Sequence, residues 1–336
     1  MIDEKVLTIS IAAYNVEKTL DQLMQSIVNT DCMDDLEVLI INDGSKDNTE
    51  EIGKKYQSQY PDSIQLITKS NGGHGSTINK GIELATGRYF KAIDGDDWFN
   101  PKSLKVVVDR LKGTHVDLVV TDFEDHYADG NVKLRDDYKV LESGKVSSFD
   151  NVCDNLPRLL YHEVIFRTEL LKEHHILLDE HCFYVDSEYV FYPLPFIITI
   201  VYMASPLYCY RLGDASQSMS PESMQKNIRQ HEKVNLNVAK YYEEHKEELC
   251  TSRRNYLLMY VSRLNARTYE ILFSFPCKKE YRDAVDEYEE ALKSISPESY
   301  AATTSRAINI YRKNSAFYPL VWLWLRIKRK TKNLGI

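Results

Sequence analysis

Short apolar runs alternate with helical periodicities along the first third of the chain. The runs are rich in β-branched residues and end at polar turns, which is typical of buried strands. They cover residues 6–12, 37–41, 64–68 and 88–93. Between them, apolar residues recur at helical spacing, as over residues 20–27 and 76–85. The pattern therefore predicts strands that alternate with helices.

Such alternation favours an α/β fold around a mostly parallel sheet with right-handed crossovers. Ligands of these sheets bind outside the carboxyl ends of the strands, where this sequence places its polar clusters. A helix over 104–111 and a strand over 117–121 continue the pattern, whereas the polar residues 122–148 predict a mobile excursion without regular structure. Beyond residue 220 the periodicity becomes helical throughout. Long helices are predicted over 222–248, 253–273 and 281–294.

The composition narrows the class of protein. The 336 residues carry a net charge of -8, which argues against a nucleic-acid-binding protein, since such domains are normally basic. The acidic excess leaves carboxylates for a cation. The six cysteines show no metal-ligand spacing, and we expect reduced thiols in a cytoplasmic protein. Residues 1–5 lack signal-peptide features, and no apolar run reaches the ~18 residues of a membrane span.

The strongest local signal is an acidic cluster, Asp94-Gly95-Asp96-Asp97, directly after an apolar strand. Carboxylates gathered at a strand end repel one another unless a cation joins them, and hard divalent ions prefer oxygen ligands together with phosphate oxygens. The cluster therefore suggests a metal that bridges a diphosphate. A short acidic motif alone is weak evidence, and the alternative is a solvated acidic turn.

Four motifs that follow one another in order favour the metal site over the solvated acidic turn. They are residues 8–15 (TISIAAYN), 38–45 (VLIINDGS), 71–73 (NGG) and the acidic cluster. Together with Asn79, Gly81, residues 85–87 and Tyr89, they make residues 6–220 resemble the family 2 glycosyltransferases of GT-A fold. The resemblance implies a catalytic domain over 1–220, with a nucleotide-sugar half over about 1–98 and an acceptor half over about 99–220. Residues 221–336 form the helical appendage.

The resemblance assigns the donor site residue by residue. It implies that Asp43 accepts a hydrogen bond from uracil, although an aspartate there also stabilises a turn in many proteins. Glycines of the NGG motif allow the backbone to approach the nucleotide-sugar, unless the segment is only a flexible loop. The residues implied to bind nucleotide or donor are Ala12, Tyr14, Asn15, Asp43, Asn71, Gly72, Gly73, Asn79, Asp94, Gly95 and Arg211.

Within the acidic cluster, the resemblance makes Asp94 the acid that faces the sugar or ribose and Asp96 the ligand of Mn²⁺ or Mg²⁺. Asp97 supports them. Trp98 either covers the sugar or packs beneath the strand end. Arg211 pairs with phosphate or forms a structural salt bridge.

One motif departs from the family. Many members carry Ala-Arg before the asparagine at 79, whereas this chain has Thr77-Ile78, which removes a basic contact. His74, Lys69 and Lys91 are the candidates to replace it near the phosphates.

The second half of the site is expected at residues 181–190. Asp186 matches the family's general base, whose preceding glutamate is missing here, and Glu188 is a candidate to compensate. An acid in a first helical turn also stabilises the helix, which is the alternative for Asp186. His162 is a candidate on the acceptor side, and Gln217 lies in a loop that resembles the family's closing loop. The processive signature Gln-x-x-Arg-Trp is absent from the sequence, which favours single additions.

The implied reaction is an inverting transfer of a hexose or N-acetylhexosamine from a UDP-sugar to a hydroxyl of a bacterial glycan or lipid-linked acceptor. The metal stabilises the departing diphosphate while Asp186 takes the hydroxyl proton. Two alternatives remain. One is a sugar-nucleotide-binding scaffold that has lost catalysis. The other, a nucleotidyltransferase, is disfavoured because the chain lacks a glycine- and arginine-rich N-terminal loop.

Residues 317–332 combine aromatics with a following basic run. This composition suits a helix at a membrane interface and a peripheral location on the inner face of the membrane. The alternative is a helix that docks on its own core or on a second subunit, as in a homo-oligomer.

Overall fold

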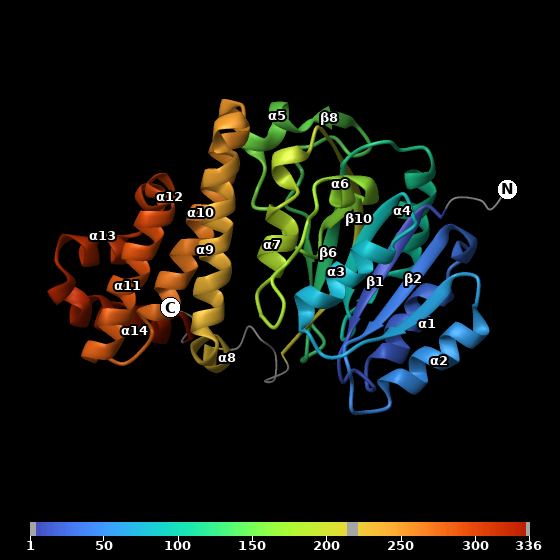
Figure 1. Ribbon diagram of the computed structural model, residues 1–336, viewed down its shortest axis with the longest axis horizontal. Helices are drawn as coiled ribbons and strands as arrows, with labels where there is room; N and C mark the ends of the chain where they lie inside the picture. The colour runs from blue at the N-terminus through green and yellow to red at the C-terminus, as the bar shows by residue number, and fades with distance from the viewer. Residues whose placement is uncertain (1–4, 214–220, 334–336) are drawn as a thin grey trace. The chain divides into compact units, whose positions relative to one another are not determined.

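The computed structural model of the protein describes residues 5–213 and 221–333. The chain divides into two compact units, Met1–Asp214 and Ala215–Ile336. The first unit contains the sheet, and the second is α-helical in its described residues (Figure 1). Each unit is described by itself below.

The strands of the first unit form one ten-stranded sheet. Their bounds are β1 Leu7–Ala13, β2 Leu36–Asn42, β3 Ile64–Thr68, β4 Tyr89–Asp94, β5 Trp98–Phe99, β6 Leu118–Tyr127, β7 Val132–Arg135, β8 Val146–Ser148, β9 Val164–Arg167 and β10 Thr199–Leu212. The order across the sheet is β3-β2-β1-β4-β9-β6-β10-β5, while β7 pairs with β6 and β8 with β10. The first four strands of this order are parallel, β9 runs antiparallel to both of its neighbours, and β6 and β10 are parallel.

Helices flank the sheet (Figure 1). They are α1 Leu20–Val28, η1 Met33–Asp35, α2 Thr49–Gln59, α3 His74–Leu84, α4 Pro101–Lys112, α5 Phe149–Val152, η2 Cys153–Asn155, α6 Thr168–Glu173, α7 Asp186–Phe191 and η3 Leu194–Phe196. Strand β1 is apolar and buried almost throughout, as expected for a central parallel strand that is covered on both faces. Helix α3 packs on β1 so closely that a β-carbon at Gly81 would clash with the Ser10 side chain.

The prediction of an irregular excursion over residues 122–148 was wrong in part. Strand β6 continues to Tyr127, and β7 and β8 lie within the same stretch. The acids of β6 mislead the sequence pattern because the fold supplies them with partners. Asp122 accepts a hydrogen bond from the hydroxyl of Tyr202 at 2.8 Å, and Asp125 pairs with Arg135 at 3.4 Å.

The second unit begins with helix α8 Pro221–Lys226. Its other elements are α9 Ile228–His245, η4 Lys246–Glu248, α10 Thr251–Leu272, α11 Lys279–Ile295, α12 Pro297–Ala302, α13 Arg306–Lys313, η5 Ser315–Phe317 and α14 Tyr318–Asn333. Helix α9 packs on α10 and α11 around buried residues such as Val238, Leu257 and Leu292. No described helix has both the length and the apolar composition that crossing a membrane requires.

Candidate active site

Three parallel strands bring the first sequence motifs to one edge of the sheet. Ala12 of β1 lies between Ile41 of β2 and Asp94 of β4 in the strand register. Tyr14 follows β1 and is half exposed. Asn15 has a positive φ of 53°, and its side-chain oxygen accepts a hydrogen bond from the backbone of Lys46 at 2.8 Å. The side chain of Asn15 therefore joins the turns that follow β1 and β2.

Asp43 is buried and anchors the glycine segment. Its Oδ1 accepts hydrogen bonds from the backbone of Gly72 at 2.9 Å and from Lys69 Nζ at 2.6 Å. Its Oδ2 accepts one from the backbone of Gly73 at 2.8 Å. Asn71 donates to the backbone oxygen of Asp43 at 3.0 Å. The Asp43 side chain thus holds residues 71–73 in place, and its contact with uracil stays a prediction.

The glycine segment packs against a part of the chain that lies about a hundred residues further on. Gly73 has a φ of 83°, and its Cα faces the backbone of His181, where an added β-carbon would lie 3.1 Å away. A β-carbon at Gly75 would clash with the backbone oxygen of Asp179. Asn79 completes the junction, because its side chain accepts from Leu178 N at 2.9 Å and donates to Leu178 O at 3.0 Å. The motif therefore positions the segment that leads to Asp186.

His74, the first residue of α3, lies between two candidate acids. Its Nε2 is 2.9 Å from Oδ1 of Asp94, and its Nδ1 is 3.2 Å from Oδ1 of Asp186. Burial alone would lower the pKa of His74, but the charges of Asp94 and Asp186 raise it well above its usual value. Burial likewise opposes ionisation of Asp94, yet His74 holds the pKa of that carboxyl below its usual range. The imidazole therefore joins two acids that lie far apart in the sequence.

The carboxylates of Asp94, Asp96 and Asp97 lie within 4.8 Å of one another. Asp97 is buried, and it accepts hydrogen bonds from Tyr208 Oη at 2.5 Å and from the backbone of Arg211 at 2.7 Å. No described side chain forms a salt bridge with the Asp96 carboxylate. Burial and the neighbouring Asp94 raise the pKa of Asp96 to about 6, although the charges of Arg211 and His74 oppose this shift. Three carboxylates gathered in this way fit a divalent cation, which prefers hard oxygen ligands.

A second group of metal-binding side chains lies on β6 and β10. Glu124, His126 and Cys209 have donor atoms within 4.8 Å of one another. His126 and Glu124 already pair at 3.0 Å, and the Cys209 thiol faces the same carboxylate at 3.8 Å. These contacts satisfy the three side chains without a metal.

Arg211 closes the acidic cluster on the side of β10. Its guanidinium donates to the backbone oxygen of Asp96 at 2.7 Å and to the side chain of Gln22 at 2.6 Å. It also lies 4.8 Å from the ring of Trp98, whose other neighbour is the His126 ring. Arg211 therefore supports the backbone of Asp96. The backbone nitrogen of Gly95 donates to Ala12 O at 3.0 Å. That Arg211 and Gly95 contact the nucleotide-sugar stays a prediction.

On the acceptor side, His162 is half buried among aromatic rings. It stacks on Phe123 at 5.0 Å and lies 4.2 Å from Tyr210, measured between ring centroids. Burial lowers the pKa of His162 to about 4, so the ring is neutral. Lys91 is fully buried and donates to the backbone oxygens of Tyr161, His162 and Val164 at 2.7 to 3.3 Å. Lys91 thus holds the segment that carries His162.

Two tyrosines contact the acids although neither was a predicted site residue; Tyr208 lies in the segment that leads to Arg211, and no motif pointed to Tyr161. Tyr161 donates to Oδ1 of Asp94 at 3.3 Å, and Tyr208 donates to Asp97. Their rings lie 6.3 Å apart. With 23 tyrosines in the chain, the type of residue gave no signal, and only the fold brings Tyr161 and Tyr208 to these acids.

Glu188 is buried on α7, where its Oε2 accepts a hydrogen bond from the backbone of Asp179 at 2.8 Å. Glu188 therefore supports the loop before Asp186, whose own side chain is 49% exposed. Gln217 lies outside the described residues.

Comparisons with known proteins agree with this geometry. Residues 8–174 match the family described as glycosyl transferase family 2. EpsH of Bacillus subtilis, a protein assigned as a glycosyltransferase, is 26% identical over 227 residues, which cover 63% of this chain and 62% of EpsH. The minor teichoic acid biosynthesis protein GgaB of Bacillus subtilis is 40% identical over 85 residues, which cover 25% of this chain and 9% of GgaB.

Two solved structures share the fold. One is S. aureus TarS 1-349 in complex with UDP-GlcNAc, with a TM-score of 0.62 and 18% identity over 92% of this chain and 91% of that chain. The other is the mannosyltransferase PcManGT from Pyrobaculum calidifontis in complex with GDP-Man and Mn²⁺. Its TM-score is 0.53 and its identity 14%, over 93% of this chain and 89% of that chain.

The first unit is a domain of GT-A fold. The chain belongs to glycosyltransferase family 2. The match spans less than two thirds of EpsH and a small part of GgaB, so these relatives do not define the activity or substrates of this chain.

Proposed function

We propose that the protein is an inverting, non-processive glycosyltransferase that moves a hexose or N-acetylhexosamine from a UDP-sugar to a hydroxyl of a glycan or lipid-linked acceptor. The observation that carries the proposal is the convergence of two sequence-distant acidic groups. Asp94 ends β4 and Asp96 follows it, Asp186 begins α7, and one imidazole contacts both Asp94 and Asp186. A single displacement needs the acids that hold the nucleotide-sugar to lie beside the base that takes the proton of the acceptor hydroxyl.

The donor half of this proposal rests on the edge formed by β1, β2 and β4. Ala12, Tyr14 and Asn15 would line the nucleotide, with Asp43 and the segment 71–73 beneath the uracil. TarS has this fold and binds UDP-GlcNAc, whereas PcManGT binds GDP-Man, so the fold alone leaves the base open. Asp43 is the residue that favours UDP, because a carboxylate can accept a hydrogen bond from the uracil ring.

Asp96 is the proposed ligand of Mn²⁺ or Mg²⁺. No described side chain forms a salt bridge with its carboxylate, and burial together with the charge of Asp94 raises its pKa to about 6, which a bound cation would offset. When bound, the metal supplies positive charge to the departing diphosphate. Asp94 is held by His74 and Tyr161, which keeps it available to orient the sugar or ribose.

Asp186 is the proposed general base. Half of its side chain is exposed, so an acceptor hydroxyl can reach it. The hydroxyl loses its proton to Asp186 as its oxygen bonds to the anomeric carbon and the bond to the diphosphate breaks. One displacement inverts the anomeric centre, so an α-linked donor gives a β-linked product.

The acceptor and the location belong to the same proposal. His162 and the rings around it would contact the acceptor. GgaB takes part in teichoic acid biosynthesis, which supports a cell-surface polymer as acceptor. We further propose a cytoplasmic protein that contacts the membrane surface through residues 317–332, either as a single copy or as a homo-oligomer.

The test is UDP release from a panel of UDP-sugars with and without Mn²⁺, in the wild type and in Asp96→Ala and Asp186→Asn. We expect metal-dependent turnover of one donor. Asp96→Ala should lose metal-dependent UDP binding, whereas Asp186→Asn should bind UDP normally and lose at least ~100-fold in kcat. Binding without turnover in the wild type would favour a scaffold, and turnover of GDP-sugars would move the donor to another nucleotide.

A further inference from the structure

Lys69, Lys91 and His74 are the candidates to replace the missing basic contact of the family, and the structure distinguishes their surroundings. Lys69 is bound to Asp43, to Ser76 and to the backbone of Ser70, with distances of 2.6 to 2.9 Å. Lys91 is fully buried and bound to three backbone oxygens. His74 alone among the three contacts Asp94 and Asp186.

The His74 ring is held in one orientation. Its backbone follows Gly73, whose φ of 83° sets the start of α3. The ring meets that of Tyr161 edge to face at 5.8 Å, and Tyr161 itself donates to the same Asp94 oxygen that His74 contacts. Only 22% of the side chain is exposed. The imidazole therefore cannot turn without losing a contact to an acid or to Tyr161.

Asp186 has much less support of its own. Its side chain is 49% exposed, and its Oδ1 has no hydrogen-bond partner of good alignment among the described residues, only the ion-pair contact with His74. Without the imidazole, Asp186 would lose this contact and its link to Asp94. Like charges repel, so the half-exposed Asp186 side chain would turn toward solvent.

We propose that His74 is a positioning residue that holds the Asp186 carboxylate beside Asp94 and keeps the general base aligned with the bound donor. The proposal rests on the proposed function and deepens it. His74 contacts one oxygen of each acid and leaves the exposed part of Asp186 to the acceptor hydroxyl. The role is geometric, since misplacement of a catalytic group by about 1 Å can lower a rate by about 100-fold.

The experiment measures kcat and KM of UDP release in the wild type, His74→Gln, Asp186→Asn and the double variant His74→Gln/Asp186→Asn. We expect His74→Gln to lower kcat by about 10- to 100-fold and to change the donor KM by less than about threefold. The double variant should be no slower than Asp186→Asn, because a residue that acts through the base has nothing left to position. His115→Gln, an exposed histidine of the same unit, is the matched control and should match the wild type.

Two results would overturn the proposal. One is a wild-type kcat in His74→Gln. The other is a double variant in which the two losses multiply, which would give His74 a role independent of Asp186. His74→Asn replaces His74→Gln if thermal unfolding shows that the glutamine variant is not folded. A wild type without turnover of any nucleotide-sugar rejects the proposed function itself, whereas an active wild type with an unaffected His74→Gln rejects only the role of His74.

Discussion

A buried histidine sits in a polar cluster inside the helical unit. His231 of α9 is 8% exposed, and its Nδ1 lies 3.2 Å from the side-chain nitrogen of Asn235 and 3.1 Å from Thr268 Oγ1. The amide nitrogen of Asn235 also donates to Leu264 O at 3.1 Å and to Thr268 Oγ1 at 2.8 Å. None of these partners is a carboxylate, and burial disfavours the charged form of the His231 ring.

This cluster gives the helical unit a pH dependence. Burial, together with Arg267, lowers the pKa of His231 from 6.5 to about 4 in the folded protein. The unfolded chain then binds this proton more readily, so the free energy of unfolding falls as the pH drops through 6.5 and stops falling below about 4. Urea unfolding followed by circular dichroism should show the wild type losing about 2 kcal/mol more than His231→Gln between about pH 7 and pH 5. Parallel losses in both proteins would contradict this assignment.

The residue scale also shows where sequence reasoning stopped. Asp43, Asn79 and the glycines were expected to face the donor, and the structure shows how each also contacts the chain itself. Asn79 binds both backbone groups of Leu178, and Asp43 binds the backbone of Gly72 and Gly73. A sequence motif shows which residue types are present but not which residues they contact. Asn79, for example, binds a residue that lies 99 positions away in the sequence.

At the scale of elements, periodicity predicted the mostly apolar strands and missed the acid-rich second half of β6. Strand β3 has the predicted bounds, and β1, β2 and β4 each differ from them by one residue at each end. The second half of β6 was missed because its acids resemble a polar loop. Tyr202 and Arg135, which pair with two of them, come from other strands. A local pattern does not contain such long-range partners.

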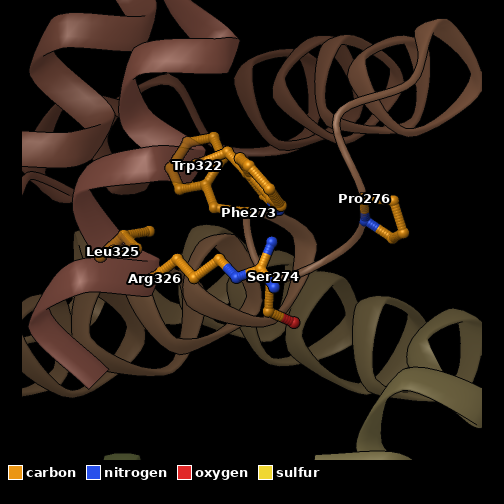
Figure 2. Close-up of a pocket in the computed structure, with 6 residues that line it drawn as sticks. All are labelled: Phe273, Ser274, Pro276, Trp322, Leu325 and Arg326. Atoms are coloured by element: carbon orange, nitrogen blue, oxygen red, sulfur yellow. The ribbon is translucent and has the colours of Figure 1, made fainter. Parts of the chain in front are cut away.

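Helix α14 is apolar on two faces. Tyr318 and Val321 are buried against the helical unit, where Tyr318 meets the ring of Phe273. Leu320, Leu323 and Ile327 are each about half exposed or more. Beside the buried face lies a groove of about 350 Å³ (Figure 2). It is lined by Phe273, Ser274, Pro276, Trp322, Leu325 and Arg326. Docking on the core and contact with a membrane are thus compatible, because they use different faces.

We therefore predict that α14 binds anionic bilayers. Residues 326–332 are mostly basic, so vesicles with phosphatidylglycerol should bind more tightly than neutral phosphatidylcholine vesicles in a sedimentation assay. Replacing Leu320, Leu323 and Ile327 by glutamine should weaken this binding at least ~10-fold without unfolding the protein, because the side chains are exposed.

The matched control for this assay is Leu177→Gln, an exposed leucine of the first unit. The control should bind vesicles like the wild type. Equal binding of the triple variant and the wild type would exclude this face as the membrane contact. A wild type that ignores vesicles but self-associates, with self-association lost in the triple variant, would show that a second copy covers the face.

At the scale of the whole molecule, every described residue of the candidate site lies within the first unit, between Ala12 and Arg211. The family match ends at residue 174, before Asp186, although the unit continues to Asp214. The donor half is therefore the part that the family describes best. The base, the acceptor side and the helical unit are where this chain can differ from its relatives.

Ligand binding should accordingly stabilise one unit and not the other. UDP with Mn²⁺ at about 100 times its Kd stabilises the state that binds it by about 2.7 kcal/mol. In hydrogen exchange followed by mass spectrometry, peptides that contain residues 71–75 and 178–186 should therefore exchange more slowly with ligand, while core peptides of α9 and α10 should not change. Asp96→Ala should abolish the protection, because the metal-bound diphosphate would then lose its proposed ligand. Protection that also reaches α9 or α10 would mean that the helical unit contacts the nucleotide or closes when it binds, and the site would have to be redrawn across both units.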